Sequence, residues 1–183
     1  MNNKRYKCGL YVGRFQPLHD GHAYVIEKMF QDCETVIIAV GSAQEYGTQR
    51  NPFSYCLRAT LIYKAFTFFY PNLLVMPVLD RAQPSNDPSW GDYLLRAVKT
   101  FAGLTPDVIY EGEEIERNNW YNNSGIPVVR VSRSVVPISA TKIREAIINC
   151  DDKWLLDNVP WTVYNVRNNL RKELLKCYNL QET

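Results

Sequence analysis

The sequence lacks the features that mark a membrane, secreted or nucleic-acid-binding protein. Its longest apolar runs are too short to cross a bilayer, and residues 1–5 lead into a strand-like segment rather than a signal peptide. Lysine and arginine number 21 against 19 aspartates and glutamates, so no basic surface is expected for nucleic acid or anionic lipid. We therefore expect a cytoplasmic protein that binds neither nucleic acid nor membrane.

Paired cysteines are also missing. The five cysteines are odd in number and widely separated, and no C-x-x-C pair occurs, so neither a zinc knuckle nor a redox motif is indicated. Cys8 and Cys33 fall in or beside apolar segments and are expected to be small core residues with reduced thiols. With 183 residues, 46% of them apolar, the chain suits one domain. We expect a core over 1–135 and a helical C-terminal part over 136–183.

Histidine is scarce, and both copies fall in one short stretch. An apolar segment ends at Gly13, a polar turn follows, and His19 and His22 lie three positions apart where a helix begins. A strand, a glycine turn and a helix N-terminus together form an anion site, because unpaired N–H groups and the helix dipole both favour phosphate. Gly21, between the histidines, leaves room for a ligand to approach the backbone. The stretch predicts a nucleotide-phosphate site.

Five strand-like segments alternate with helical ones along the chain. Strands are expected at 6–12, 35–41, 73–79, 107–110 and 127–131, and helices at 21–31, 52–70, 90–101, 140–148, from 151, and at 160–178. Pro77 suggests that the third strand lies at a sheet edge, and 111–120 is expected to be a loop or short helix. This alternation predicts an α/β fold with a Rossmann-like, doubly wound parallel sheet, strand order 3-2-1-4-5, and C-terminal helices. Ligands then bind in the crevice between the first and fourth strands.

Two motifs carry a resemblance to a known superfamily. Leu18–His22 and Ile138–Arg144 resemble the H-x-G-H and I-S-x-T-x-x-R motifs of the nucleotidyltransferase α/β-phosphodiesterase superfamily. Gly13–His19, Gly41–Gln44 and Arg50–Phe53 further resemble the archaeal-type nicotinamide-nucleotide adenylyltransferases. The resemblance runs over nearly the whole chain.

The resemblance implies transfer of an adenylyl group from ATP to nicotinamide mononucleotide (NMN), giving NAD and pyrophosphate. The acceptor phosphate has a second pKa of about 6 and is mostly dianionic at neutral pH, so direct in-line attack needs no general base. Catalysis then consists of bringing polyanions together and stabilising their charge. Mg²⁺ is expected to bind mainly through the ATP phosphates, without a protein metal site, and the relatives imply a homo-oligomer.

The resemblance also assigns the ATP side of the site. His22 would hold the α-phosphate, while His19 and Arg14 would hold the other ATP phosphates; these three and Arg144 form the expected catalytic set. The remaining ATP-binding residues are expected to be Gly13, Phe15, Ser139 and Thr141. Ser139 is equally typical of a simple helix cap, and the two roles are compatible.

On the mononucleotide side, the resemblance implies that Arg50 neutralises the acceptor phosphate and that Trp90 stacks on the nicotinamide ring. Asn86, Gly41 and Ser42 complete this expected site. A tryptophan at a helix start is as typical of a packing residue. Asp80 could touch a ribose hydroxyl, although a loop cap is the favoured interpretation.

Two other functions are compatible with the same motifs. One is adenylyl or cytidylyl transfer to another phosphorylated acceptor, such as phosphopantetheine or FMN. The other is a nucleotide sensor that binds ATP without turnover. The presence of His19, His22, Ser139 and Arg144 together favours turnover.

Overall fold

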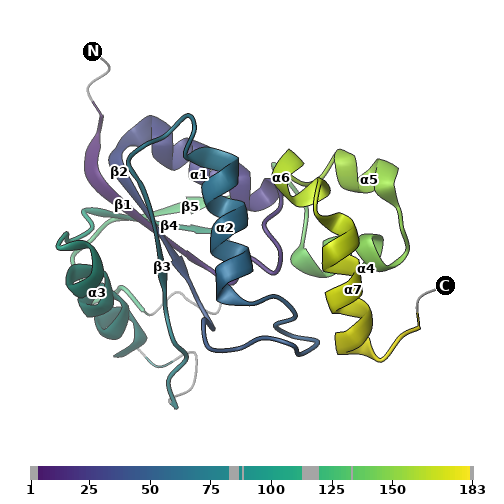
Figure 1. The fold of residues 1–183 in the computed structure, drawn as a ribbon. Coiled ribbons are helices and arrows are strands. Elements are labelled where there is room, and N and C mark those ends of the chain that lie inside the picture. Colours follow the sequence, from purple (N-terminus) through teal and green to yellow (C-terminus); the bar gives the residue numbers. More distant parts are fainter. Residues whose placement is uncertain (1–3, 83–86, 88, 113–119, 133, 182–183) are drawn as a thin grey trace.

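A parallel five-stranded sheet lies at the centre of the computed structural model, which describes residues 4–82, 87, 89–112, 120–132 and 134–181 (Figure 1). The strands are β1 (Tyr6–Gly13), β2 (Cys33–Val40), β3 (Leu73–Pro77), β4 (Val108–Gly112) and β5 (Val128–Val131). Their order is β3-β2-β1-β4-β5, and all four pairings are parallel. The predicted fold class and strand order are confirmed, as is the edge position of the strand that contains Pro77.

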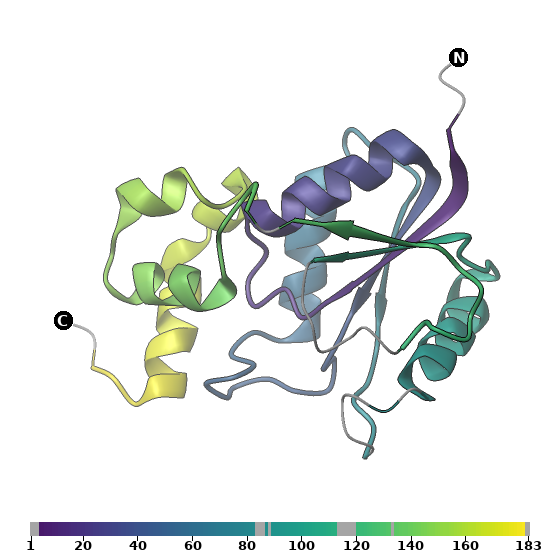
Figure 2. The same ribbon diagram turned by 180° about the vertical axis from the view of Figure 1, so that it is seen from behind.

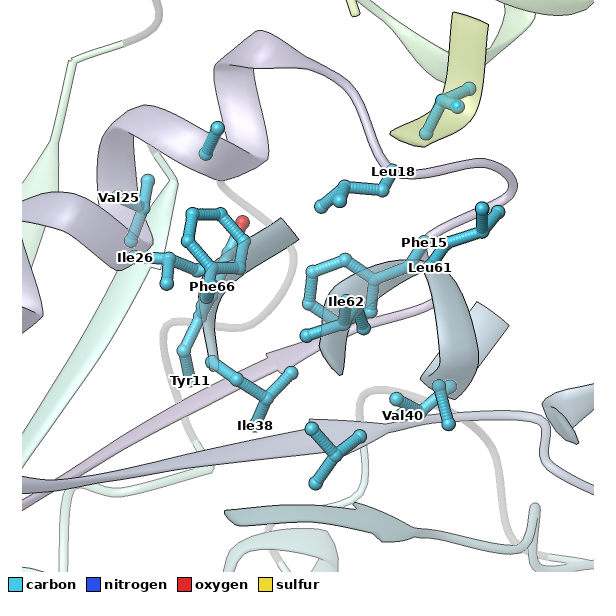
Figure 3. Close-up of a cluster of buried hydrophobic side chains, with 14 of the residues drawn as sticks. Tyr11, Phe15, Leu18, Val25, Ile26, Ile38, Val40, Leu61, Ile62 and Phe66 are labelled. Carbon is cyan, nitrogen blue, oxygen red and sulfur yellow. The ribbon is translucent and has the colours of Figure 1, made fainter. Parts of the chain in front are cut away.

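Helices cover both faces of the sheet. The helices α1 (Asp20–Asp32) and α2 (Tyr55–Phe66) lie on one face, and α3 (Ser89–Ala102) lies on the other (Figures 1 and 2). Strand side chains alternate between faces, so each face has its own core cluster. Figure 3 shows part of the first cluster, to which Leu61 and Ile62 of α2 and Ile38 of β2 all belong. Cys8 and Cys33 are buried in these clusters, as expected.

The C-terminal part forms a separate group of helices beside the sheet (Figure 2). It consists of α4 (Ala140–Ile148), α5 (Asp152–Leu156), α6 (Trp161–Tyr164) and α7 (Arg167–Tyr178). Ile143 and Ile147 of α4 and Leu170 and Leu174 of α7 belong to the same core cluster as the sheet face beneath α1 and α2. The C-terminal helices therefore share one hydrophobic core with that face of the sheet. Among the described residues, none of the helices combines the length and apolarity that spanning a bilayer requires.

Several predicted boundaries are wrong, including the end of the second helix, which lies at Phe66 rather than near residue 70. The second helix begins at Tyr55, not near Pro52, because Ser54 caps it and accepts a hydrogen bond from the Leu57 N–H. The predicted helix 160–178 is divided into α6 and α7 by Asn165 and Val166. Strand β4 continues through 111–112, where a loop was expected, because β5 pairs with it over those positions.

Candidate active site

A cavity of about 290 Å³ opens at the carboxyl ends of β1 and β4, on the side of the C-terminal helices. This is the crevice predicted from the strand order, between the first and fourth strands. Its lining includes the following expected site residues: Gly13, Arg14, Phe15, His19, His22, Arg50, Ser139, Thr141 and Arg144. All expected catalytic and ATP-binding residues therefore lie around one cavity.

The two histidines lie side by side where α1 begins. His19 is the N-cap residue with an extended backbone, and its ring stacks on that of His22 at a centroid distance of 3.7 Å. The ring of Phe15 contacts His22 from another side, at 4.6 Å. A Cβ at Gly21 would lie 3.1 Å from the His19 ring, so a larger residue would displace it. The spacing thus gives two adjacent imidazoles at the positive end of a helix dipole.

The second motif supplies another helix N-terminus. Ser139 caps α4, since its hydroxyl accepts a hydrogen bond from the Lys142 N–H at 3.3 Å. The Arg144 guanidinium donates to the Gln16 carbonyl at 2.9 Å and to the Thr141 hydroxyl at 3.3 Å. The bond to Gln16 joins two sequence motifs across a separation of 128 positions. The turn after β1 and the N-terminus of α4 thus form one continuous surface, rich in hydrogen-bond donors of the kind that suit an anion.

The expected mononucleotide residues are less concentrated. Arg50 is exposed and lines the cavity, but Gly41 and Ser42 lie outside its lining. Trp90 is 7% exposed and stacks on Trp120 in the core cluster beneath α3, at 5.6 Å and 15°. In this arrangement Trp90 packs in the core, and its stacking on nicotinamide stays a prediction.

Two other expectations concern the loops nearby. Asn86 lies outside the described residues. Asp80 is exposed, and its backbone N–H donates to the Gln44 side chain at 3.1 Å.

Glu111 is a cavity residue that sequence reasoning missed. Its carboxylate, 8% exposed, lies at the end of β4, 3.8 Å from the Arg130 guanidinium. Among the described lining residues, the other side chains are cationic, neutral polar or apolar. Its place directly after the predicted fourth strand, beside the crevice expected between the first and fourth strands, is the sequence signal that could have assigned it to the site.

The cavity chemistry fits an anionic ligand better than a bare metal ion. Within the described ranges, no three histidine, cysteine, aspartate or glutamate side chains gather as a metal site. The lining instead offers three arginines, two imidazoles and the hydroxyls of Ser139 and Thr141. Such donors bind phosphate oxygens. This donor set would suit a metal ion that enters the cavity already bound to the phosphates of a nucleotide.

The chain matches a known protein family over most of its length. The family model described as cytidylyltransferase-like matches residues 10–146, well over half of the chain, and this range contains both motifs. The chain belongs to the cytidylyltransferase-like family. This cytidylyltransferase-like range contains the C-terminal half of β1, all of β4 and most of α4, so the family match covers the cavity.

Curated relatives show which members of this broad family the chain is similar to. A nicotinamide-nucleotide adenylyltransferase of Methanospirillum hungatei is 33% identical over 160 residues, covering 86% of this chain and 84% of the relative. One of Methanococcus aeolicus is 28% identical and covers 94% of this chain and 98% of the relative. These matches confirm the assignment made from the motifs and show that this cytidylyltransferase-like chain is a nucleotidyltransferase.

Solved structures agree on the fold. The bifunctional NMN adenylyltransferase/ADP ribose pyrophosphatase of Francisella tularensis, complexed with AMP and Mn ion, aligns with a TM-score of 0.71 at 21% identity. The alignment covers 95% of this cytidylyltransferase-like chain but only 53% of that structure. The chain thus spans about half the length of this neighbour.

Proposed function

We propose that the crevice transfers the adenylyl group of ATP to nicotinamide mononucleotide. The observation that carries the proposal is the junction of two anion-binding helix ends around one cavity, with the His19–His22 pair on one side and Arg144 on the other. The names of the archaeal relatives support NMN as the acceptor. The nucleotide substrates are ATP and NMN, and the products are NAD and pyrophosphate.

The reaction balances without an acid, a base or a covalent intermediate. A phosphate oxygen of the mononucleotide forms a bond to the α-phosphorus of ATP. The bond from that phosphorus to the oxygen bridging to the β-phosphate breaks, and pyrophosphate leaves with the electron pair. The acceptor phosphate is already largely dianionic at neutral pH, so no proton has to be removed first. The protein's task is therefore placement and charge stabilisation.

Each side of the cavity has a part in this scheme. His22, which stacks on His19 and contacts the tilted ring of Phe15, holds the α-phosphate oxygens as their charge rises. His19 and Arg14 hold the ATP phosphates on the side of β1, since both line the cavity there. Arg50, exposed at the rim, neutralises the acceptor phosphate.

The N-terminus of α4 receives the leaving group. Ser139, Thr141 and Arg144 are placed to hold the β- and γ-phosphates, because the cap, the hydroxyl and the guanidinium all face the same cavity. Mg²⁺ would be held mainly by the ATP phosphates and would supply neutralisation of their charge. A homo-oligomeric assembly remains a prediction from the resemblance alone.

An acceptor panel tests the proposal. The protein is incubated with Mg-ATP and, separately, with NMN, nicotinic acid mononucleotide, phosphopantetheine and FMN, and pyrophosphate release is measured. We expect release with a pyridine mononucleotide and formation of the matching dinucleotide. Release only with phosphopantetheine or FMN would overturn the acceptor. ATP binding without release for any acceptor would favour the sensor.

A further inference from the structure

A buried arginine lies behind the phosphate turn, outside the cavity lining. Arg58, on α2, is 0% exposed, and burial lowers the pKa of its guanidinium to about 10. Its NH1 donates to the carbonyls of Arg14 and Gly41 at 2.7 and 2.8 Å, and its NH2 donates to the carbonyl of Ser42 at 3.0 Å. One side chain thus bonds the turns that follow β1 and β2.

Both of these turns contain a non-glycine residue in the left-handed region. Phe15 has φ of 52° and Ser42 has φ of 49°. L-residues avoid this region, so such conformations persist where surrounding bonds hold them. The carbonyls that Arg58 binds immediately precede Phe15 and Ser42, and the Ser42 carbonyl is bound as well. Arg58 is therefore placed to hold both strained turns.

A second buried side chain, that of Gln16, bonds the same turn after β1 to the segment that precedes α2. Gln16 is 2% exposed, and its amide donates to the Phe53 carbonyl at 3.0 Å and accepts from the Phe53 N–H at 2.9 Å. The Gln16 carbonyl in turn receives the Arg144 guanidinium. The side chains of Arg58 and Gln16 are together called the loop clamp.

The peptide geometry links the loop clamp to the cavity. In a planar trans peptide the C=O and N–H groups point in opposite directions. Because the Arg14 carbonyl points to Arg58, the Phe15 N–H of the same peptide points away from it. Arg14 and Phe15 both line the cavity, so the orientation of this peptide affects the surface that a phosphate meets.

We propose that Arg58 and Gln16 are positioning residues for the transfer reaction, holding the turn over 13–17 in the shape that stabilises the ATP phosphates in the transition state. The inference rests on the proposed function. It differs from a purely structural role because displacement of the turn by about 1 Å can cost roughly 100-fold in rate while the protein stays folded.

The main test is Arg58→Lys, which keeps a cation but loses the planar fork that reaches carbonyls on two turns. We expect kcat to fall by about 100-fold, with KM for each substrate changed by less than about threefold. The matched control is Arg171→Lys, because Arg171 also donates to a carbonyl, that of Ile148, but within the C-terminal helices. The control is expected to keep kcat within about twofold.

Chemical rescue separates positioning from general stability. Added ethylguanidinium should raise the kcat of Arg58→Ala at least tenfold. Ethylammonium at the same concentration should not, because only the planar guanidinium reproduces the hydrogen-bond geometry of the arginine side chain. If the Arg58 variants do not fold, Gln16→Met removes both bonds to Phe53 without changing charge. We expect this variant to fold, as judged by circular dichroism, and to lose at least about tenfold in kcat.

The outcomes distinguish this inference from the proposed function. The loop clamp would be overturned if Arg58→Lys kept a kcat per folded molecule within threefold of the wild-type value, even if its melting temperature fell. Where the Arg58 variants do not fold, the same threshold applies to Gln16→Met. That result would leave the proposed function intact, because wild type would still form the dinucleotide. If wild type used another acceptor, the comparison would be made on that acceptor. Absence of turnover with every acceptor would overturn both.

Discussion

The two halves of the crevice differ in how completely they are assembled. On the phosphate half, β1, the following turn and the N-terminus of α4 bring every expected residue to one cavity, and Arg144 bonds the two sides together. On the acceptor half, Arg50 reaches the cavity while Trp90 is packed against Trp120 under α3. Helix ends and strand ends place phosphate ligands, whereas the acceptor half depends on loop conformations. Four substitutions test this difference.

Removal of His22 should give the largest effect. In His22→Ala we expect kcat to fall about 1,000-fold, since about 1.4 kcal/mol of transition-state stabilisation corresponds to each factor of ten. ATP affinity should persist, because His19 and Arg14 remain. Kinetics and equilibrium titration with ATP provide the two measurements. Unchanged turnover would remove His22 from the catalytic set.

Arg144→Ala should rank second. We expect kcat/KM for ATP to fall about 100-fold, because the variant loses a phosphate ligand and the bonds to Gln16 and Thr141. The control is Lys153→Ala, which removes an exposed cation from α5. A loss as large in the control would mean that overall charge, and not the junction of the two halves, determines the rate.

Trp90→Phe probes the acceptor half as the structure presents it. We expect the free energy of unfolding to fall by about 1–2 kcal/mol, because the smaller ring leaves the stack on Trp120 incompletely filled. Denaturant titration measures this. Unchanged stability with a raised KM for the mononucleotide would contradict the packing role and would place the indole against the substrate.

Arg50→Ala should give the smallest of the four effects. Arg50 is exposed at the cavity rim, where water competes for the phosphate, so we expect KM for the mononucleotide to rise about tenfold. KM for ATP should stay within about twofold. Steady-state kinetics with each substrate varied in turn decide this. A rise in KM for ATP alone, with KM for the mononucleotide unchanged, would assign Arg50 to the phosphate half.

Sequence periodicity predicted the sheet order, and the two motifs predicted which residues would gather on the phosphate half of the cavity, because both depend on short-range patterns. An apolar strand followed by Gly13 and two histidines three apart fixes a strand end and a helix start, and parallel crossovers then set the neighbours. Pro77 similarly predicted the edge strand. The start of α2 was misplaced because Pro52 is a typical first helical residue, while Ser54 provides the actual cap.

Arg58 and Glu111 show what local patterns do not contain. An arginine on a helix is normally exposed, and the burial of Arg58 follows from carbonyls that two left-handed turns direct toward it. Glu111 was expected in a loop, because its place in β4 depends on pairing with β5. Both depend on contacts between distant segments, which single-sequence patterns do not encode.

The stereochemical course at the α-phosphorus tests most directly the claim that the crevice performs one direct transfer. ATP carrying sulfur at the α-phosphorus in a single configuration is converted with the mononucleotide, and the configuration of the dinucleotide product is determined. A single in-line displacement predicts inversion. Retention would require two displacements through a covalent enzyme intermediate and would contradict the account.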